Sequence, residues 1–359
     1  MLLSYLWPPP QGEWGKYTKR PAPCQADNGL ACLVNRYTIE RPKLGKKERA
    51  LQILVTGGAG FVGSHLVRWL VEQGHRVRVL DNFSMGRRSS LQPVGAAVEL
   101  VEGDIRNSST VQQAVAGCEL VLHLAAMVSV VQSMEQPLEA QAINATGSIN
   151  IFEAARQAGV RRVVNMSSSA VYGDSDRLPL REHEPPCPLS PYALTKLAAE
   201  HAGTLYTRSY GLEVVSLRCF NIYGPRQDPS SPYAAVVPRF IEWLRAGQPP
   251  IIFGDGLQSR DFVYVGDVVQ ALWRAATAPA IAGHVFNVAR GEALVLRDLA
   301  ALLAEIIGVA VAPVYAPPRP GEIIHSYADV RLFAELAGFR AQVGLREGLA
   351  QTVAQWEAL

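Results

Sequence analysis

The chain has 359 residues, of which 48% are hydrophobic and 18% charged, and its formal net charge is +2. This composition is typical of a soluble globular protein, and it gives no reason to expect nucleic acid or a membrane as partner: the net charge is small, and no apolar run reaches the roughly 18 residues of a membrane span. The five cysteines are scattered, odd in number and without metal-ligand spacing, which favours reduced thiols, a cytoplasmic location and no metal site.

The first 50 residues differ in kind from the rest. They are rich in Pro, Gly and polar residues, have no helical or strand period, and end in the charged run KLGKKERA. The apolar start is too short for a signal-peptide core, lacks a basic beginning and is followed by no small-residue cleavage site. We expect residues 1–50 to be a disordered or loosely attached extension, or to reflect a misassigned start codon.

Beyond residue 50, strand patterns alternate with helical patterns. Strands are expected at 51–56, 76–81, 97–104, 119–126, 161–168 and 212–218, and helices at 61–73, near 108–116, around 137–158 and from 191 onward. Buried apolar strands that alternate with helices indicate a parallel sheet covered on both faces. After residue 223 the regular alternation of strand and helix patterns ends. The predicted class is therefore α/β, a Rossmann-like doubly wound parallel sheet with a smaller, mostly helical C-terminal substrate domain.

A glycine-rich turn follows the first strand. Gly57, Gly60 and Gly63 form G-x-x-G-x-x-G, a close variant of the dinucleotide fingerprint. A side chain there would keep the backbone away from a pyrophosphate, while the next helix offers free N–H groups and its positive dipole end. Because the turn lies between an apolar strand and a helix, it predicts a dinucleotide site more strongly than the glycines alone.

The second predicted strand ends in an acidic residue, Asp81. It lies near the roughly 20-residue offset of a carboxylate that binds the adenosine ribose, and it would repel a 2′-phosphate, which favours NAD over NADP. Arg87 and Arg88 weaken this preference slightly. Asp104, at the end of the third strand, could close the adenine pocket, although either aspartate could also be a simple turn residue.

An acid–base site is predicted at the fifth strand. The run 167–169 is Ser-Ser-Ser and falls at the strand's carboxyl end, where ligands bind in open α/β sheets. The next helix begins at LSPYALTK, where Ser190 can cap it, Pro191 fits its first turn, and Tyr192 and Lys196 lie one turn apart on one face.

A free tyrosine titrates near ~10, but a neighbouring ammonium and a positive nicotinamide would lower its pKa. Tyr192 could then take a proton from a substrate hydroxyl while the substrate carbon gives hydride to NAD+. A serine of the run would hydrogen-bond the same oxygen. A tyrosine ring packed under the lysine stem is the alternative, and the glycine turn upstream favours catalysis.

From about Gln52 to Trp356, the chain resembles the extended short-chain dehydrogenase/reductases and, within them, the nucleotide-sugar 4-epimerases. The matching stretches are TGGAGFVGSHL, LDNFS, GDIR, HLAA, SSSAVYG, SPYALTK, LRCFNIYGPRQDP, GDGLQSRDFVYVGDV and RPGE. The resemblance implies a catalytic triad of Ser168, Tyr192 and Lys196, with Ser169 able to share the serine's role. It implies that NAD is held by Gly57, Gly60, Phe61, Val62, Gly63, Asp81, Asn82, Asp104, Ile105, Leu124, Ala125, Ala126, Tyr192 and Lys196.

The residues after the catalytic serine bear on the reaction. The sister 4,6-dehydratases carry an Asp-Glu pair in the next two places, and the related UDP-glucuronate decarboxylases carry a Glu in the second; this sequence has Ser169 and Ala170. The resemblance thus implies an NAD-dependent epimerase that inverts C4 of a UDP-hexose or UDP-N-acetylhexosamine through a 4-keto intermediate. Another nucleotide-sugar activity, such as a reductase, a 3,5-epimerase, or a UDP-glucuronate epimerase or decarboxylase, is the alternative. A non-catalytic NAD-bound regulator is disfavoured by the intact triad.

The resemblance also implies a place for the UDP-sugar. Arginine suits bidentate phosphate binding. The implied substrate residues are Asn221, Arg260 and Arg319 on the diphosphate, Glu322 on the uridine ribose, and Ser129, Ser168, Ser169, Gln227, Ala235 and Ser326 around the sugar. A small residue at Ser326 would admit an N-acetyl group, so N-acetylated sugars are favoured.

The resemblance further implies a homodimer formed through two helices of each subunit. It also divides the chain: residues 51–222, joined by 265–280, would bind NAD, and residues 223–359 would mainly bind the UDP-sugar. Two stretches depart from the family pattern, the extension 1–50 and HLAAMVSVVQS, and the second leaves the wall of the sugar pocket undetermined.

Overall fold

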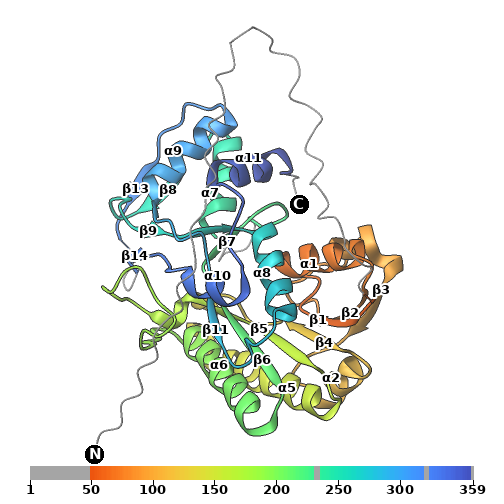
Figure 1. The fold of residues 1–359 in the computed structure, drawn as a ribbon. Helices are drawn as coiled ribbons and strands as arrows, with labels where there is room; N and C mark the ends of the chain where they lie inside the picture. Colours follow the sequence, from red (N-terminus) through yellow and green to blue (C-terminus); the bar gives the residue numbers. More distant parts are fainter. Residues whose placement is uncertain (1–48, 230–234, 319–322, 357–359) are drawn as a thin grey trace, which may run out of the picture. The chain divides into compact units, whose positions relative to one another are not determined.

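A parallel sheet is the centre of the computed structural model, which describes residues 49–229, 235–318 and 323–356. Within these residues, seven strands pair in the order β11-β6-β5-β4-β1-β2-β3, all of them parallel (Figure 1). Their bounds are β1 Gln52–Thr56, β2 Arg76–Asp81, β3 Val98–Glu102, β4 Leu120–His123, β5 Arg162–Ser168, β6 Glu213–Cys219 and β11 Val285–Val288. The predicted extension lies outside the described residues, apart from its last two.

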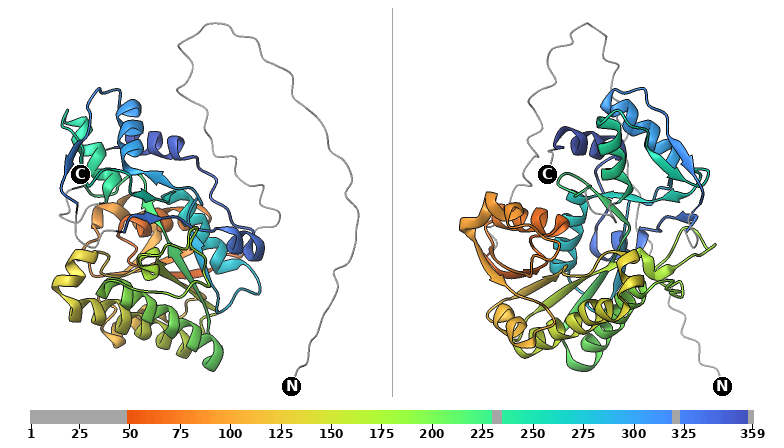
Figure 2. Two further views of the ribbon diagram at one scale, coloured as in Figure 1. Left: turned by 90° about the vertical axis from the view of Figure 1, so that its left-hand side faces the viewer. Right: turned by 180° about the vertical axis from the view of Figure 1, so that it is seen from behind.

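Helices cover both faces of this sheet (Figures 1 and 2). One face carries α1 Phe61–Glu72, α8 Val265–Thr277 and α10 Arg331–Ala337, and the other carries α2 Ser108–Val115, α5 Gly147–Gln157 and α6 Pro191–Tyr210. The apolar side of each helix explains this arrangement: Leu66 and Leu70 of α1 are buried in one core cluster with Leu272 of α8, while Ile151 and Phe152 of α5 are buried in a second cluster.

Between the strands lie shorter elements. They are η1 Arg88–Ala97, α3 Val130–Glu135, α4 Pro137–Ala140, the π-helix η2 Gln141–Thr146 and the 3₁₀-helix η3 Ser169–Tyr172. The helix expected around 137–158 is confirmed in its extent, since α4, η2 and α5 follow one another without a break, but the sequence analysis did not predict the π-helical segment inside it. Within the π segment, the side chain of Asn144 is hydrogen-bonded to the backbone of Met127, a tertiary contact that helical periodicity does not show.

The second lobe lies beyond β6. Its helices are α7 Val236–Arg245, α9 Leu296–Ile307 and α11 Leu345–Ala354, which share a core cluster with Tyr223 and Phe262. Its short strands pair as β7 Asn221–Tyr223 with β10 Phe262–Tyr264, as β8 Ile251–Phe253 with β13 Val314–Ala316, and as β9 Ser259–Arg260 with β12 Leu294–Val295 and β14 His325–Ser326.

The predicted fold class is confirmed: a Rossmann-like sheet with helices on both faces and a mostly helical C-terminal region. One strand of the sheet, β11, comes from a stretch that the sequence analysis assigned mainly to the second lobe. The parallel register brings the carboxyl ends of the central strands to one edge, so Thr56, Asp81, His123 and Ser168 all lie there.

Candidate active site

The glycine turn after β1 is closely packed on one side and open on the other. Gly57 has φ +68°, and a Cβ on it would lie 2.8 Å from the Ala125 nitrogen; a Cβ on Gly63 would lie 2.1 Å from the Gly57 carbonyl oxygen. A Cβ on Gly60 would meet a single atom, the Gly57 carbonyl oxygen at 3.3 Å. Gly60 also caps α1 without a side-chain bond, so the first N–H groups of the helix are left for an anion. The turn fits a pyrophosphate.

Asp81 stands at the predicted ribose position and is already fixed in place. Its two carboxylate oxygens accept hydrogen bonds from the backbone nitrogens of Ala59, at 2.9 Å, and Phe83, at 2.8 Å. The two nearby arginines are paired with acids: Arg87 with Asp228 at 2.6 Å, and Arg88 with Glu102 while also lying over the Phe83 ring. A fixed carboxylate and two occupied arginines suit a 2′-hydroxyl better than a 2′-phosphate.

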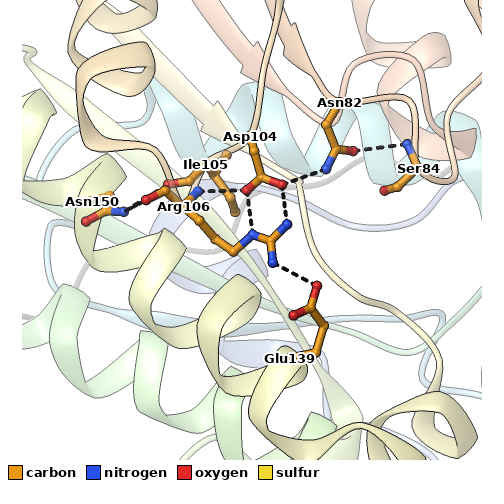
Figure 3. A network of polar contacts seen from close by, with 7 residues as sticks. All are labelled: Asn82, Ser84, Asp104, Ile105, Arg106, Glu139 and Asn150. Carbon is orange, nitrogen blue, oxygen red and sulfur yellow. Dashed lines mark hydrogen bonds and ion pairs between the residues drawn. The ribbon is translucent and has the colours of Figure 1, made fainter.

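Figure 3 shows the loop after β3, where the adenine pocket was predicted. Asn82 Nδ2 donates to Asp104 at 2.9 Å, and Arg106 pairs both with Asp104, at 2.7 Å, and with Glu139 of α4, at 2.8 Å. The hydrogen bonds from Arg106 lower the pKa of Asp104 to about 2, so it is a carboxylate at neutral pH. The loop is thereby tied to the start of the α4–α5 segment, and Ile105 is held through its carbonyl oxygen by Asn150 Nδ2 at 3.0 Å.

The three predicted catalytic side chains come together at the end of β5. The Ser168 hydroxyl is near enough to the Tyr192 hydroxyl to lower its pKa, and Lys196 Nζ donates to the Met166 carbonyl oxygen at 2.8 Å. Ser168 also accepts from the Ala170 nitrogen at 3.2 Å, which begins the 3₁₀-helix η3. The helix-start prediction is confirmed: the Ser190 hydroxyl accepts from the Ala193 nitrogen, and Pro191 occupies the first turn.

The pKa of Tyr192 is shifted in the direction opposite to the one expected from the sequence. In the protein alone, burial raises the pKa of Tyr192, and the Ser168 hydroxyl opposes this shift without reversing it. Burial also lowers the pKa of Lys196 to about 8, against the opposing fields of Cys219 and Glu200. A positively charged nicotinamide ring would favour the phenolate in this buried site.

The sequence analysis did not predict the residues that form hydrogen bonds with the backbone of Tyr192. Ser133 of α3 accepts a hydrogen bond from the Tyr192 backbone nitrogen at 3.0 Å and donates to the Val130 carbonyl oxygen at 2.6 Å. Thr195 donates to the Tyr192 carbonyl oxygen at 2.8 Å and accepts from Asn144 at 3.1 Å. No local sequence pattern reveals these contacts, because Ser133 and Asn144 lie about 50 to 60 residues upstream in the chain.

The serines of the run 167–169 have different partners. Ser167 donates to Glu200 at 2.5 Å, and Glu200 forms a buried ion pair with Arg218 at 2.8 Å. Ser168 is thus the serine whose hydroxyl lowers the pKa of Tyr192, and Ser169 begins η3 beside it. The ion pair joins α6 to β6, with Glu200 one helical turn beyond Lys196.

Part of the predicted UDP-sugar set converges on the small strands of the second lobe. Ser326 is the register partner of Arg260, and Asn221 donates through both its backbone and side-chain nitrogens to the Asp261 carbonyl oxygen, at 3.0 and 3.1 Å. Gln227 donates to the Ile222 carbonyl oxygen at 3.3 Å, and its own side-chain oxygen is a buried acceptor with no donor among the described residues.

The remaining predicted positions are more peripheral or lie elsewhere. Ala235 is the exposed N-cap residue of α7, and Ser129 is buried as the N-cap of α3, where it accepts from the Gln132 nitrogen at 3.0 Å. Leu124, Ala125 and Ala126 follow β4, and Leu124 and Ala125 lie against the glycine turn. Arg319 and Glu322 lie outside the described residues.

Among the described residues, none of the helices is both long and apolar enough to cross a membrane. In the same part of the chain, no three or more His, Cys, Asp or Glu side chains are grouped to hold a metal ion.

The fold and the glycine turn together are those of a dinucleotide-dependent enzyme, and Tyr192 lies where an acid–base group was predicted. A model of the NAD-dependent epimerase/dehydratase family matches residues 53–289. A putative UDP-glucose 4-epimerase of Methanocaldococcus jannaschii is 40% identical over 303 residues, which cover 84% of this chain and 97% of the relative. The chain belongs to the NAD-dependent epimerase/dehydratase family, and its cofactor is NAD.

Solved structures extend the comparison to three dimensions. The UDP-N-acetylglucosamine 4-epimerase of Methanobrevibacter ruminantium M1, in complex with UDP-N-acetylmuramic acid, aligns with a TM-score of 0.82 at 35% identity and covers 86% of this chain and 98% of that one. The UDP-glucose 4-epimerase of Thermus thermophilus in complex with NAD aligns at 0.77 and 39% identity, covering 85% and 98%. The resemblance noted from the sequence is therefore confirmed.

Proposed function

We infer that the chain is an NAD-dependent 4-epimerase of UDP-sugars. The observation that carries this inference is the Ser168–Tyr192–Lys196 site at the sheet edge, with the glycine turn beside it and no carboxylate at Ser169 or Ala170. Elimination of water or carbon dioxide needs a further acid or base near the sugar, whereas reversible oxidation at one carbon needs a single proton-transfer group and a hydride carrier. Relatives and solved neighbours described as UDP-sugar 4-epimerases support the same reaction.

In the proposed mechanism, Tyr192 removes the proton of the 4-hydroxyl group, and Ser168 hydrogen-bonds to the same oxygen as it becomes a carbonyl. NAD, held by the glycine turn and Asp81, would supply the hydride chemistry at C4. Lys196, fixed by its bond to the Met166 carbonyl oxygen, stabilises the phenolate. Tyr192 then gives its proton back to the oxygen. The net reaction inverts C4 with no change in oxidation state.

Between the two half-reactions, the 4-keto sugar must rotate so that its opposite face is presented for hydride return, while the nucleotide stays bound. We propose that Asn221 and Arg260 hold the diphosphate, together with Arg319, and that Glu322 binds the uridine ribose. The position of Asn221 supports this, because its amide is oriented by the Asp261 carbonyl oxygen, next to Arg260 in the chain. Residues 51–222 with 265–280 would then form the NAD half, and 223–359 most of the substrate half.

We propose a preference for N-acetylated sugars, with Ser326 as the residue that leaves room for the acetyl group. Ser326→Tyr should reduce turnover of UDP-GlcNAc more than that of UDP-Glc, because one pocket contact is worth about 1–3 kcal/mol of discrimination. Initial rates on both substrates, measured by NMR, give the ratio. An equal loss on both would remove Ser326 from this role, with Gln227, Ala235 and Ser129 as the next candidates.

A homodimer and a cytoplasmic location complete the proposal. Large apolar side chains stand exposed on α5 and α6, namely Ile149, Leu194, Leu205 and Tyr210, which supports helix pairing between two subunits. Cys118, Cys187 and Cys219 are unpaired, as suits a reducing compartment. Analytical ultracentrifugation of wild type and Leu205→Arg tests the dimer; a wild-type monomer at all concentrations would contradict it.

The reaction itself is tested with Tyr192→Phe. The variant should keep bound NAD and lose turnover by orders of magnitude, because the ring stays and the proton-transfer group is gone. Wild type should interconvert the C4 epimers of UDP-GlcNAc or UDP-Glc without added reductant, as seen by NMR. Retention of most activity in Tyr192→Phe would remove Tyr192 from its role, and a 4-keto-6-deoxy or decarboxylated product would replace the assigned reaction.

A further inference from the structure

A buried polar network runs beneath the site from β1 to α6 and consists of Thr56, His123, Ser148, Asn144 and Thr195. Thr56 Oγ1 lies 2.7 Å from His123 Nδ1, and His123 Nε2 lies 3.0 Å from Ser148 Oγ. Each member has almost no solvent exposure. Buried polar groups that satisfy one another fully fix the geometry of the elements that carry them.

The direction of each hydrogen bond follows from the number of protons available. Ser148 donates its single hydroxyl proton to the backbone carbonyl oxygen of Asn144 at 2.5 Å, so it can only accept at His123; the Asn144 side chain continues the network to Thr195. His123 Nε2 therefore carries a proton, and Nδ1 of the neutral ring is an acceptor. Thr56 donates to that Nδ1, and its oxygen accepts from the backbone nitrogens of Leu124 and Ala125, both at 3.2 Å.

The surroundings keep His123 neutral. Burial lowers its pKa to about 3, and the Lys196 ammonium lowers it further. The ring packs against Phe152, which is uncharged, with centroids 6.4 Å apart. A second proton on the ring would have to replace the hydrogen bond from Thr56.

The two ends of the network reach the two halves of the reaction centre. At one end, the Ala125 nitrogen, which Thr56 accepts from, is the atom that a Cβ on Gly57 would approach to 2.8 Å, so this segment backs the glycine turn. At the other end, Asn144 Nδ2 donates to Thr195, and Thr195 donates to the Tyr192 carbonyl oxygen. His123 can join the two ends because its two ring nitrogens point in opposite directions, Nδ1 toward Thr56 and Nε2 toward Ser148.

We propose that His123 is a positioning residue that, as a neutral Nε2–H tautomer, holds the NAD turn through Thr56 and the Tyr192 helix through Ser148. The inference rests on the proposed roles of the glycine turn and Tyr192. His123 contacts Thr56 through one ring nitrogen and Ser148 through the other. A substitution can therefore remove one contact and keep the other, which separates the effect on NAD from the effect on Tyr192.

Two substitutions each keep one connection. His123→Asn retains an acceptor toward Thr56 but is too short to reach Ser148; His123→Gln can donate to Ser148 but gives up the position of Nδ1. His123→Asn should therefore lose about tenfold or more in kcat and keep NAD, while His123→Gln should release NAD about tenfold or more faster and lose less kcat at saturating NAD, since one buried hydrogen bond is lost in each. Thermal midpoints of both variants report folding.

The same loss of NAD retention and kcat in both variants would overturn the proposal, because it would mean that His123 only fills space. A second measurement does not depend on any variant folding. In the ¹⁵N-histidine-labelled wild type, long-range ¹H–¹⁵N spectra should show the His123 ring in the Nε2–H form, without titration between about pH 5.5 and 8.5. The His65 ring, whose Nε2 lies 2.9 Å from the Pro225 carbonyl oxygen and whose pKa is lowered by burial to about 4, should behave in the same way, so the two rings are assigned separately. A His123 ring that titrates in this range, or that is protonated at Nδ1, would contradict the assignment.

The spectrum requires no turnover, so this inference and the proposed reaction fail differently. If Tyr192→Phe kept its activity while the His123 tautomer was as expected, the catalytic assignment would be wrong and the network would no longer position a catalytic residue. If Tyr192→Phe lost its activity while His123 titrated, the reaction would stand and this inference would be wrong.

Discussion

The buried ion pair between Arg218 and Glu200 leads to a specific prediction for stability. Arg218 and Glu200 have side chains only 5% and 3% exposed, and Arg218 donates to both carboxylate oxygens, with its Nη2 2.8 Å from Oε2. Arg218 also lies over the Tyr172 ring, 4.7 Å from its centroid. Burial works against the guanidinium charge, but the contacts with Glu200 outweigh it and raise the pKa of Arg218.

Arg218→Met removes the cation and leaves the Glu200 carboxylate buried with Ser167 as its remaining hydrogen-bond donor. Breaking a buried pair from one side costs about 3–5 kcal/mol, because an uncompensated charge stays in a site of low dielectric constant. The double variant Arg218→Met/Glu200→Leu removes both charges. It should be less destabilised than the single variant, since replacing a whole buried pair by apolar groups is often close to neutral.

Unfolding in urea is monitored by fluorescence. The NAD concentration is kept fixed, because bound ligand shifts the apparent stability. The matched control is Arg346→Met, which breaks an exposed pair with Glu305 whose side chains are 60% and 64% exposed and which should leave the midpoint unchanged. This reasoning would be refuted if Arg218→Met had the same urea midpoint as the control. It would also be refuted if the double variant were less stable to urea than Arg218→Met.

Two further predictions concern the cofactor turn and the catalytic lysine. Gly57→Ala should abolish retention of NAD on desalting, because a Cβ at φ +68° would lie 2.8 Å from the Ala125 nitrogen; Gly117→Ala, at φ +73° with nothing within 4 Å, has the backbone strain without the clash and should keep NAD. Equal NAD content would contradict the packing argument. Because the pKa of Lys196 is lowered to about 8, kcat should fall above that pH as the ammonium is lost, and constant turnover to about pH 10 would contradict this. The unfolded lysine keeps its proton up to about 10.5, so this group's contribution to stability should rise with pH between about 8 and 10.5.

Local patterns in the sequence were sufficient for the main features of fold and site. The glycine turn, Asp81 and the Tyr192–Lys196 pair each depend on residues close together in the chain, and alternating apolar strands place their carboxyl ends at one edge of the sheet. These features were predicted because spacing within one turn or one strand fixes their geometry.

What the sequence could not reveal depends on contacts between distant segments. The π segment Gln141–Thr146 exists where Asn144 reaches the backbone of Met127, and helical periodicity cannot report such a contact. The direction of the Tyr192 pKa is set by burial in the folded protein, which a motif does not show.

The most direct test of the central claim follows the hydrogen at C4. UDP-sugar deuterated at C4 is incubated with the enzyme in ordinary water, and a second sample without label is incubated in D₂O; both are followed by NMR. If C4 is oxidised and reduced again on one enzyme molecule with its bound NAD, the deuterium stays at C4 in both epimers and no solvent deuterium enters the sugar. Loss of the label from C4, or entry of solvent deuterium at C4 or a neighbouring carbon, would contradict the assignment of this chain as an NAD-dependent 4-epimerase.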